Sequence, residues 1–364
     1  MDGWEIADRR MHNVRLSGPP LAAPADVVRW FGAVQSQDYG PARWSLGQRS
    51  PGFLDSDVRR LFDEGLMLRT HVLRPTWHFV LPEDIRWLLA LTGPRVHALN
   101  AYYYRQLGLD AAELDKAERL VADALAGGNH LPRKALVEVF RVAGIGIEGF
   151  RTAYLLMSAE LNGVICSGPM KGRQHTYALV DERAPAVPAL SREAALAELT
   201  RRYFTSHGPA TVKDFRWWSS LTVADINAGL ELVGADLDRV EHDGVTYWYA
   251  PAPRPPAVAS PTVHLVQGYD EYLVGYVESK HLLDVAGLVR WQTGDRTVFV
   301  GAVLLDGQLA GHWKCSVRKA DVLFEVSLYR PLDPAADEAL GAAVDRQAGF
   351  LGLPAATAIT LIAG

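Results

Sequence analysis

Apolar residues in the first part of the chain recur first at helical spacing and then at strand spacing. Between residues 25 and 35 they follow Pro24, a residue suited to the first turn of an amphipathic helix. The expected elements are, in order, a helix over 25–35, a helix over 55–64, strands over 66–72 and 76–81, and a helix from Pro82 to about residue 91. We assign residues 1–125 to this N-terminal unit.

The same order of helices followed by a pair of strands returns twice. In the second unit we expect helices over 132–143 and 150–161 and strands at 164–166 and 176–179. In the third we expect helices over 191–204, 211–219 and 222–233 and a hairpin over 237–249 that turns at Asp243-Gly244. Helices followed by a two-stranded wing describe a winged helix. The pattern therefore predicts three tandem winged-helix units, over residues 1–125, 126–188 and 189–250.

A proline-rich stretch over 250–261 predicts an extended linker and the clearest domain boundary. Beyond it the pattern becomes that of strands. The expected elements are a strand over 263–266, a hairpin over 298–316 that turns at Asp306-Gly307, a strand over 322–329, and a helix over 334–350. We therefore predict an α+β protein whose β-rich C-terminal domain, residues 251–364, resembles a barrel or half-barrel.

The composition is that of an ordinary soluble protein. The chain has 364 residues, 49% hydrophobic and 22% charged. Its first ten residues alternate in charge, and no run approaches the ~20 apolar residues that span a bilayer, so we expect a cytoplasmic protein without a membrane anchor. The two cysteines, Cys166 and Cys315, lie far from each other and from any zinc-ligand spacing, so we expect both to be buried and predict no metal site.

The net charge of -5 is not typical of a nucleic-acid-binding protein, which needs Lys and Arg to neutralise phosphates. A binding face can nevertheless be basic while the rest of the surface is acidic. The segment Gly144–Gly149 matches GxGxxG, but it follows a helical pattern and not a strand, so it does not predict a dinucleotide site.

The candidate chemistry lies at Gln35-Ser36-Gln37-Asp38, where the first apolar helix ends. If the backbone is extended there, both glutamines lie on one face, and two carboxamides can orient a water molecule or face a developing positive charge. Alternatively, the glutamines only satisfy buried backbone groups at the helix end. Asp38 is the rival catalytic residue because a carboxylate can act as a general base, although an extended backbone would point it away from the glutamines.

The order of motifs along the chain resembles the winged-helix DNA-binding-domain family that includes the AlkZ DNA glycosylases. The resemblance extends over nearly the full length. The motifs that carry it are Gln35-Ser36-Gln37, Leu73-Arg74-Pro75-Thr76-Trp77-His78, and the segments 172–179, 208–219 and 268–276.

The resemblance implies a C-shaped DNA-binding channel built from three winged helices and a β-rich domain. It implies that Gln35 and Gln37 serve hydrolysis of alkylated purine nucleosides, including the unhooking of interstrand crosslinks. Ser36 stands where the family typically has an aliphatic residue. Double-stranded, alkylated or crosslinked DNA is the implied partner, and we expect a monomer that needs no cofactor.

Eight basic residues are candidate DNA ligands, because guanidinium groups fit phosphate and an exposed basic wing can enter a groove. They are Arg43, Arg49, Arg69, Arg74, His78, Lys171, Arg173 and His175. For the arginines the alternative is an ion pair, for His78 a structural hydrogen bond, and for the residues from 171 to 175 a solvated loop.

We therefore predict a monofunctional DNA glycosylase that acts on N7-alkylated purines. Two alternatives remain open: a non-catalytic DNA-binding or regulatory protein of the same fold, and a protein that sequesters a DNA-damaging small molecule. The sequence does not decide whether the base is rotated out of the duplex.

Overall fold

The computed structural model describes residues 1–253, 255, 259–288 and 301–361. After α1 (Gly3–Asn13), the predicted helices and strands of the N-terminal unit occur in the predicted order, and the structure adds a two-residue strand and a helix between the first two predicted helices. Its elements are α2 (Pro24–Phe31), β1 (Val34–Gln35), α3 (Tyr39–Gly47), α4 (Asp55–Asp63), β2 (Leu68–His71) and β3 (Trp77–Val80), with strand order β1-β3-β2. A long helix, α5 (Ile85–Gln106), leads to the second unit and extends well beyond the predicted end near residue 91.

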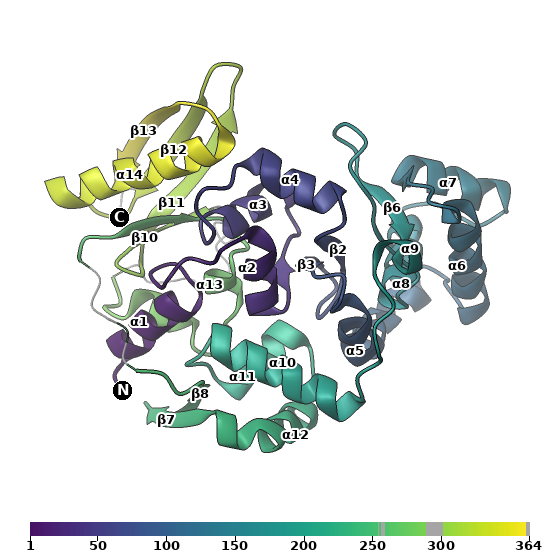
Figure 1. Cartoon of the computed structure of the whole chain (residues 1–364), viewed down its shortest axis with the longest axis horizontal. Coiled ribbons are helices and arrows are strands. Elements are labelled where there is room, and N and C mark those ends of the chain that lie inside the picture. The colour runs from purple at the N-terminus through teal and green to yellow at the C-terminus, as the bar shows by residue number, and fades with distance from the viewer. Residues whose placement is uncertain (254, 256–258, 289–300, 362–364) are drawn as a thin grey trace.

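The second and third units repeat this topology (Figure 1). The second contains α6 (Ala111–Leu125), β4 (Leu131–Pro132), α7 (Arg133–Val142), α8 (Arg151–Leu161), β5 (Ile165–Ser167) and β6 (Thr176–Leu179), in strand order β4-β6-β5, and ends in α9 (Val180–Arg183). The third contains α10 (Arg192–Ser206), α11 (Val212–Ser219), α12 (Val223–Val233), a 3-10 turn over Gly234–Asp236, β7 (Asp238–His242) and β8 (Val245–Tyr249). Ala210 bridges Trp248 on β8, in the position that β1 and β4 occupy in the other units.

Local signals set most of these boundaries. Thr211 and Thr222 each close a capping box at the start of a helix, and Asp243-Gly244 turns the hairpin with φ of 49° and 73°. The first amphipathic helix ends at Phe31, earlier than predicted, because Gly32 takes φ 84°, outside the helical region.

The described residues of the C-terminal part, 259–288 and 301–361, contain one open five-stranded sheet. Its elements are β9 (Val263–Val266), α13 (Glu271–Val274), a 3-10 helix over Lys280–Asp284, β10 (Gly301–Leu305), β11 (Gln308–Val317), β12 (Val322–Leu328), α14 (Pro334–Leu351) and β13 (Ala355–Leu361). The strand order is β13-β12-β11-β10-β9, so the sheet does not close, and of the predicted barrel or half-barrel the closed barrel is wrong. The chain crosses over through α14 and adds β13 parallel to β12, which leaves β13 at one edge and β9 at the other. The strand β13 was not predicted.

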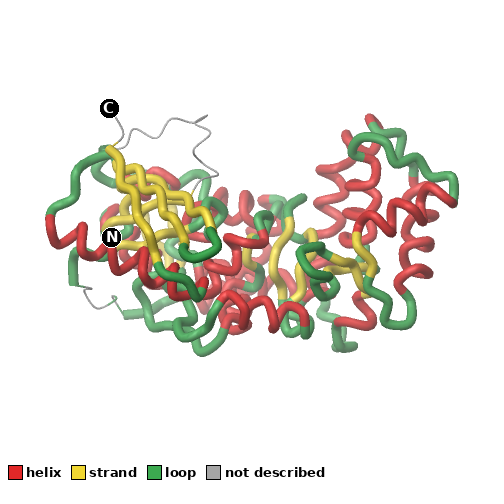
Figure 2. Tube along the Cα trace, turned by 90° about the horizontal axis from the view of Figure 1, so that it is seen from above, coloured by secondary structure: helices red, strands yellow, loops and turns green. Residues whose placement is uncertain are grey.

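The hydrophobic cores do not follow the predicted domain boundaries. One core joins the N-terminal unit, the third unit and the C-terminal sheet, although the linker over 250–261, four of whose residues lie outside the described part, separates them in sequence. A second core over residues 109–165 is formed by α6, α7 and α8, so it begins inside the segment assigned to the first unit. Figure 2 shows the C-terminal strands and the helices of the second unit at opposite ends of the molecule.

A buried ion pair ties α3 to the segment just before α13. The guanidinium of Arg49 donates to both carboxylate oxygens of Asp270 at 2.7 and 2.8 Å, and both side chains are almost inaccessible to solvent. Arg49 also donates to the carbonyls of Val14 and Ser45. The expectation that Arg49 binds DNA is therefore wrong, because its guanidinium is buried and is paired with Asp270 inside the protein.

We expect Arg49→Met to lower the free energy of unfolding by about 3–5 kcal/mol, since it leaves the Asp270 carboxylate buried without its cation. Arg318→Met, which removes a half-exposed pair with Asp321, is the matched control and should change it by less than about 1 kcal/mol. Urea denaturation at pH 7 measures both. Equal effects of the two substitutions would contradict the structural role of Arg49.

Candidate functional site

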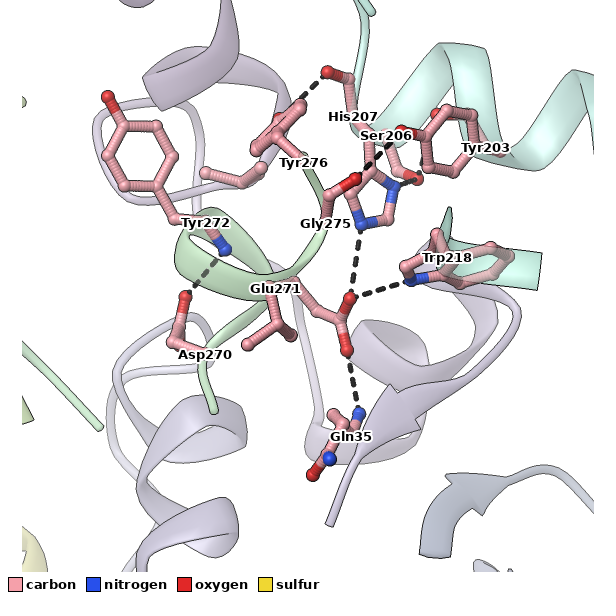
Figure 3. Close-up of polar contacts among 12 residues, drawn as sticks. Gln35, Tyr203, Ser206, His207, Trp218, Asp270, Glu271, Tyr272, Gly275 and Tyr276 are labelled. Carbon is pink, nitrogen blue, oxygen red and sulfur yellow. Dashed lines mark hydrogen bonds and ion pairs between the residues drawn. The ribbon is translucent and has the colours of Figure 1, made fainter. Parts of the chain in front are cut away.

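The backbone of the glutamine motif is held by a buried carboxylate from the C-terminal part. β1 pairs with β3 so that Gln35 lies opposite His78. The amide nitrogen of Gln35 donates to Glu271 Oε1 at 2.7 Å. The other oxygen of Glu271 accepts hydrogen bonds from Trp218 Nε1 at 2.8 Å and His207 Nε2 at 3.2 Å (Figure 3).

Glu271 remains ionised because it is surrounded by donors. Burial by itself raises the pKa of this carboxyl, but the hydrogen bond and charge interaction with His207, the hydrogen bond from the Gln35 backbone and the nearby charge of Arg74 bring it down to about 2. Burial lowers the pKa of His207, although its hydrogen bond and charge interaction with Glu271 act in the opposite direction. Its Nε2–H donates to the carboxylate, and its Nδ1 lies 2.9 Å from Ser206 Oγ, which donates to the Arg202 carbonyl.

The two glutamine side chains do not lie side by side. Gln35 is 3% exposed, and its Oε1 accepts from the backbone amide of Gln37 at 2.7 Å. Gln37 is partly exposed, and its own Oε1 accepts from the Trp77 amide at 3.3 Å. Of the two, only Gln37 lines the large pocket described below. The strand ends at Gln35, and the Gln35 side chain accepts the hydrogen bond of the Gln37 backbone amide that no neighbouring strand accepts.

Asp38 lies on the same pocket wall as Gln37. The paired strand ends at Gln35, the chain bends at Gln37 and Asp38, and α3 begins at Tyr39 with Asp38 as its N-cap residue. The Asp38 side chain makes no cap hydrogen bond and is exposed to solvent. Gln37 and Asp38, not Gln35 and Gln37, are therefore the motif side chains that face the pocket.

Arg69 on β2 fixes the other side of the motif backbone. It is 7% exposed, and it donates to the carbonyl of Ser36 at 3.0 Å and of Gln37 at 3.3 Å. Its guanidinium lies 4.4 Å from the centre of the Trp77 ring. Burial lowers the pKa of Arg69 to about 10, so it is still a cation at neutral pH. The structure gives this predicted DNA ligand a role in holding the motif.

A pocket of about 790 Å³ opens between the N-terminal and second units. Six cationic side chains and two carboxylates line it, although the whole chain carries a net charge of -5. The cations are Arg43, Arg59, Arg69, Arg133, Lys134 and Arg173, and the carboxylates are Asp38 and Glu160. The basic concavity favours an anionic partner.

The predicted wing residues lie around this pocket. Arg173 is exposed and His175 is half-buried in its wall, while Lys171 is exposed at the tip of the β5–β6 hairpin. Arg43 also lines the pocket, but its guanidinium is paired with Asp55 at 2.7 and 3.0 Å. These four residues remain candidate DNA ligands.

Two further candidates lie inside the protein. His78 is fully buried, its Nδ1 lies 3.0 Å from the Thr76 carbonyl, and burial lowers its pKa to about 3. Arg74 buries its Nε and Nη2, and its guanidinium lies 5.9 Å from the Trp217 ring. Neither residue lines the pocket. For His78 the expectation of DNA contact is wrong, because the β1–β3–β2 sheet encloses the ring.

Glu160, Arg133 and Lys134 also line the pocket, and the sequence did not predict them. Glu160 joins the second unit to the first, since Trp77 Nε1 donates to it at 3.2 Å and His71 Nδ1 lies 2.5 Å from its other oxygen. Arg133 and Lys134 form the exposed first turn of α7. Two cations at a helix N-terminus oppose the helix dipole, so their position was a signal of function that the sequence carried.

The described residues contain no cluster of His, Cys, Asp and Glu that could hold a metal ion. Cys166 is buried, as expected, whereas Cys315 is half-buried. Among the described helices, none has the length and apolarity to cross a membrane.

Residues 28–350 match the family described as DNA glycosylase AlkZ-like. The chain belongs to the AlkZ-like DNA glycosylase family. The family expected from the resemblance is thereby confirmed. A curated relative, the interstrand DNA cross-link repair glycosylase of Streptomyces sahachiroi, is 24% identical over 325 residues, which cover 84% of this chain and 85% of the relative.

The fold of this AlkZ-like protein is similar to the solved structure of the Streptomyces sahachiroi DNA glycosylase AlkZ. The two agree with a TM-score of 0.75 at 21% identity, over 98% of this chain and 100% of the other. The mixed α and β architecture of the chain is thus that of the solved AlkZ structure.

We expect Glu271→Gln to destabilise the protein at pH 7 and to flatten its acid sensitivity. The carboxyl has a pKa of about 2 in the folded state against an ordinary 4.5. Its contribution, roughly 3 kcal/mol, is therefore complete above about pH 4.5 and is lost as the pH falls toward 2.

Urea denaturation from pH 7 to 2.5 tests this expectation. The gap between wild type and Glu271→Gln should narrow through that window, whereas Glu64→Gln, at an exposed residue of the N-terminal unit, should follow wild type throughout. A gap that stays constant with pH would show that the Glu271 charge does not stabilise the fold.

Proposed function

We propose that this AlkZ-like protein is a monofunctional DNA glycosylase that hydrolyses the N-glycosidic bond of N7-alkylated purines in double-stranded DNA. The observation that carries the proposal is the wall of the basic pocket, where the carboxamide of Gln37 lies next to the exposed carboxylate of Asp38. An N7-linked interstrand crosslink contains the same kind of glycosidic bond, so crosslinked DNA is a second substrate.

Hydrolysis of this glycosidic bond requires few catalytic groups from the protein. N7-alkylation makes the purine a cationic leaving group, so the bond breaks without a strong general acid, and positive charge develops on the sugar. In the proposed mechanism Gln37 orients the attacking water, Asp38 accepts its proton, and both oxygens face the developing charge. Gln35 does not contact the substrate in this mechanism. Its Oε1 accepts a hydrogen bond from the backbone amide of Gln37 and so positions that residue.

The repeated topology supports a DNA-binding role. We infer that each of the three helix-and-strand repeats is a winged helix and that the second presents its β5–β6 wing to DNA. Lys171 and Arg173 at the wing and Arg133 and Lys134 on α7 are exposed cations suited to phosphates. The third unit contributes no cation from α12, whose sequence is VADINAGLELV.

One observation favours a second candidate, a DNA-binding protein without hydrolysis. The Oε1 atoms of both motif glutamines already accept backbone hydrogen bonds, as expected of residues that only complete the fold. A binder would show tight, salt-dependent affinity for methylated duplex DNA and would leave no abasic sites.

We expect Gln37→Ala to slow the release of 7-methylguanine from methylated DNA by about 100-fold or more, because it removes a group that acts on the transition state. Asp38→Asn should also slow release, because a carboxamide cannot accept the proton of the attacking water. Gln106→Ala, at an exposed residue near the end of α5, is the control. Unchanged release by both motif variants, with wild type active, would exclude this pair as the catalytic residues.

We expect replacement of both Arg133 and Lys134 by alanine to reduce the slope of log affinity against log salt by about two, since each phosphate contact contributes about one. Arg141→Ala is the control, because Arg141 lies on the same helix but pairs with Glu138. Titration of fluorescent duplex DNA at several salt concentrations measures both slopes. Equal slopes for the two variants would remove α7 from the DNA interface.

A further inference from the structure

The pocket beside Gln37 has two chemically different zones. Its rim carries exposed cations from two directions, Arg133 and Lys134 on α7 and Arg173 on the hairpin. Its wall contains the rings of Tyr39 and His175, which meet edge to face with centroids 4.7 Å apart. The volume of about 790 Å³ lies in the range of sites that enclose a small molecule.

Two polar atoms in that wall lack a good hydrogen bond. The hydroxyl of Tyr39 is buried without a hydrogen bond of good geometry, in a residue that is only 9% exposed, and its polar neighbour, the guanidinium of Arg43, is already paired with Asp55. His175 Nδ1 is buried and unpaired. Burying such groups without a partner costs about 1–3 kcal/mol each. Unpaired polar atoms beside a catalytic candidate therefore point to a ligand that supplies the missing bonds.

The protonation states of these groups indicate which ligand. Burial raises the pKa of Tyr39 to about 12, and burial with the charges of Arg69 and Arg43 lowers the pKa of His175 to about 4. At neutral pH the wall thus offers a phenol and an uncharged imidazole, which can each donate and accept. This set matches the edge of a nucleobase, whereas phosphate is better matched by the cations at the rim.

We propose that the pocket receives the nucleobase being released, rotated out of the duplex, with Tyr39 and His175 hydrogen-bonding to its edge and the rim cations holding the flanking phosphates. This inference rests on the proposed glycosylase function and adds to it the position of the leaving base. The volume leaves space for the alkyl substituent of the lesion as well as the purine.

The first test separates recognition from folding. Tyr39→Phe removes a hydroxyl whose polar neighbour, Arg43, keeps its ion pair with Asp55. The free energy of unfolding should therefore change by less than about 1 kcal/mol, while release of 7-methylguanine falls by about tenfold. A structural hydroxyl would give the opposite pattern, a loss of stability with unchanged release. His175→Phe, which keeps a ring against Tyr39, should also slow release, and Tyr102→Phe on the exposed face of α5 is the control.

The second test addresses base specificity. 7-Methyladenine and 7-methylguanine are both cationic leaving groups but carry different groups on their edges. Tyr39→Phe should change the ratio of their release rates by about tenfold, whereas Gln37→Ala should slow both alike. An unchanged ratio in both Tyr39→Phe and His175→Phe would overturn the assignment of these residues to base recognition.

The third test asks whether the base leaves the stack. Wild-type protein is mixed with duplex DNA that carries 2-aminopurine opposite a 2′-fluorinated 7-methylguanine nucleotide, which resists hydrolysis. Binding should increase the 2-aminopurine fluorescence several-fold, and binding without any increase would overturn the rotated-base proposal. If the wild-type protein releases no base from ordinary methylated DNA, the proposed glycosylase function itself is wrong. That result differs from one in which the protein is active but the Tyr39 and His175 variants or the 2-aminopurine fluorescence do not change.

Discussion

The position of the glutamine motif depends on one buried carboxylate. Glu271 comes from the C-terminal part, yet it accepts hydrogen bonds from the backbone amide of Gln35 in the N-terminal unit and from the side chains of His207 and Trp218 in the third. A buried anion is tolerated only where donors surround it, so these three segments must meet at one point. The ion pair between Arg49 and Asp270, one residue away in the chain, fixes the same junction from the side of α3.

Much of the fold was predictable because its signals are local. Thr211 and Thr222 begin helices by capping, and glycines after Asp243 and Asp306 mark the tight turns of hairpins. Strand β13 was not predicted because it pairs in parallel with β12 after a helix, so no hairpin turn in the sequence marks its start. The barrel was expected because a count of strands does not say whether the edges meet.

The site was predictable only in its location. The sequence drew attention to residues 35–38, but side-chain direction depended on where the strand stopped, and a two-residue strand breaks the alternation on which the expectation relied. Burial separated the basic residues in the same way, since Arg49 and His78 are enclosed and Arg173 is exposed. The charge of a residue does not indicate whether its side chain is buried. Burial depends on contacts with segments that are distant in sequence.

The second unit has its own hydrophobic core, and it supplies one wall of the pocket, while the wall that carries Gln37 belongs to the shared core. The hydrogen bonds that join the walls include those that Trp77 Nε1 donates to Glu160 and the Arg69 amide donates to Ser167 Oγ. Cys166 and Val180 of the second unit also pack in the shared core. A wider pocket would therefore cost both these hydrogen bonds and buried apolar contacts, so the size of adduct that fits is linked to the stability of the junction between the two units.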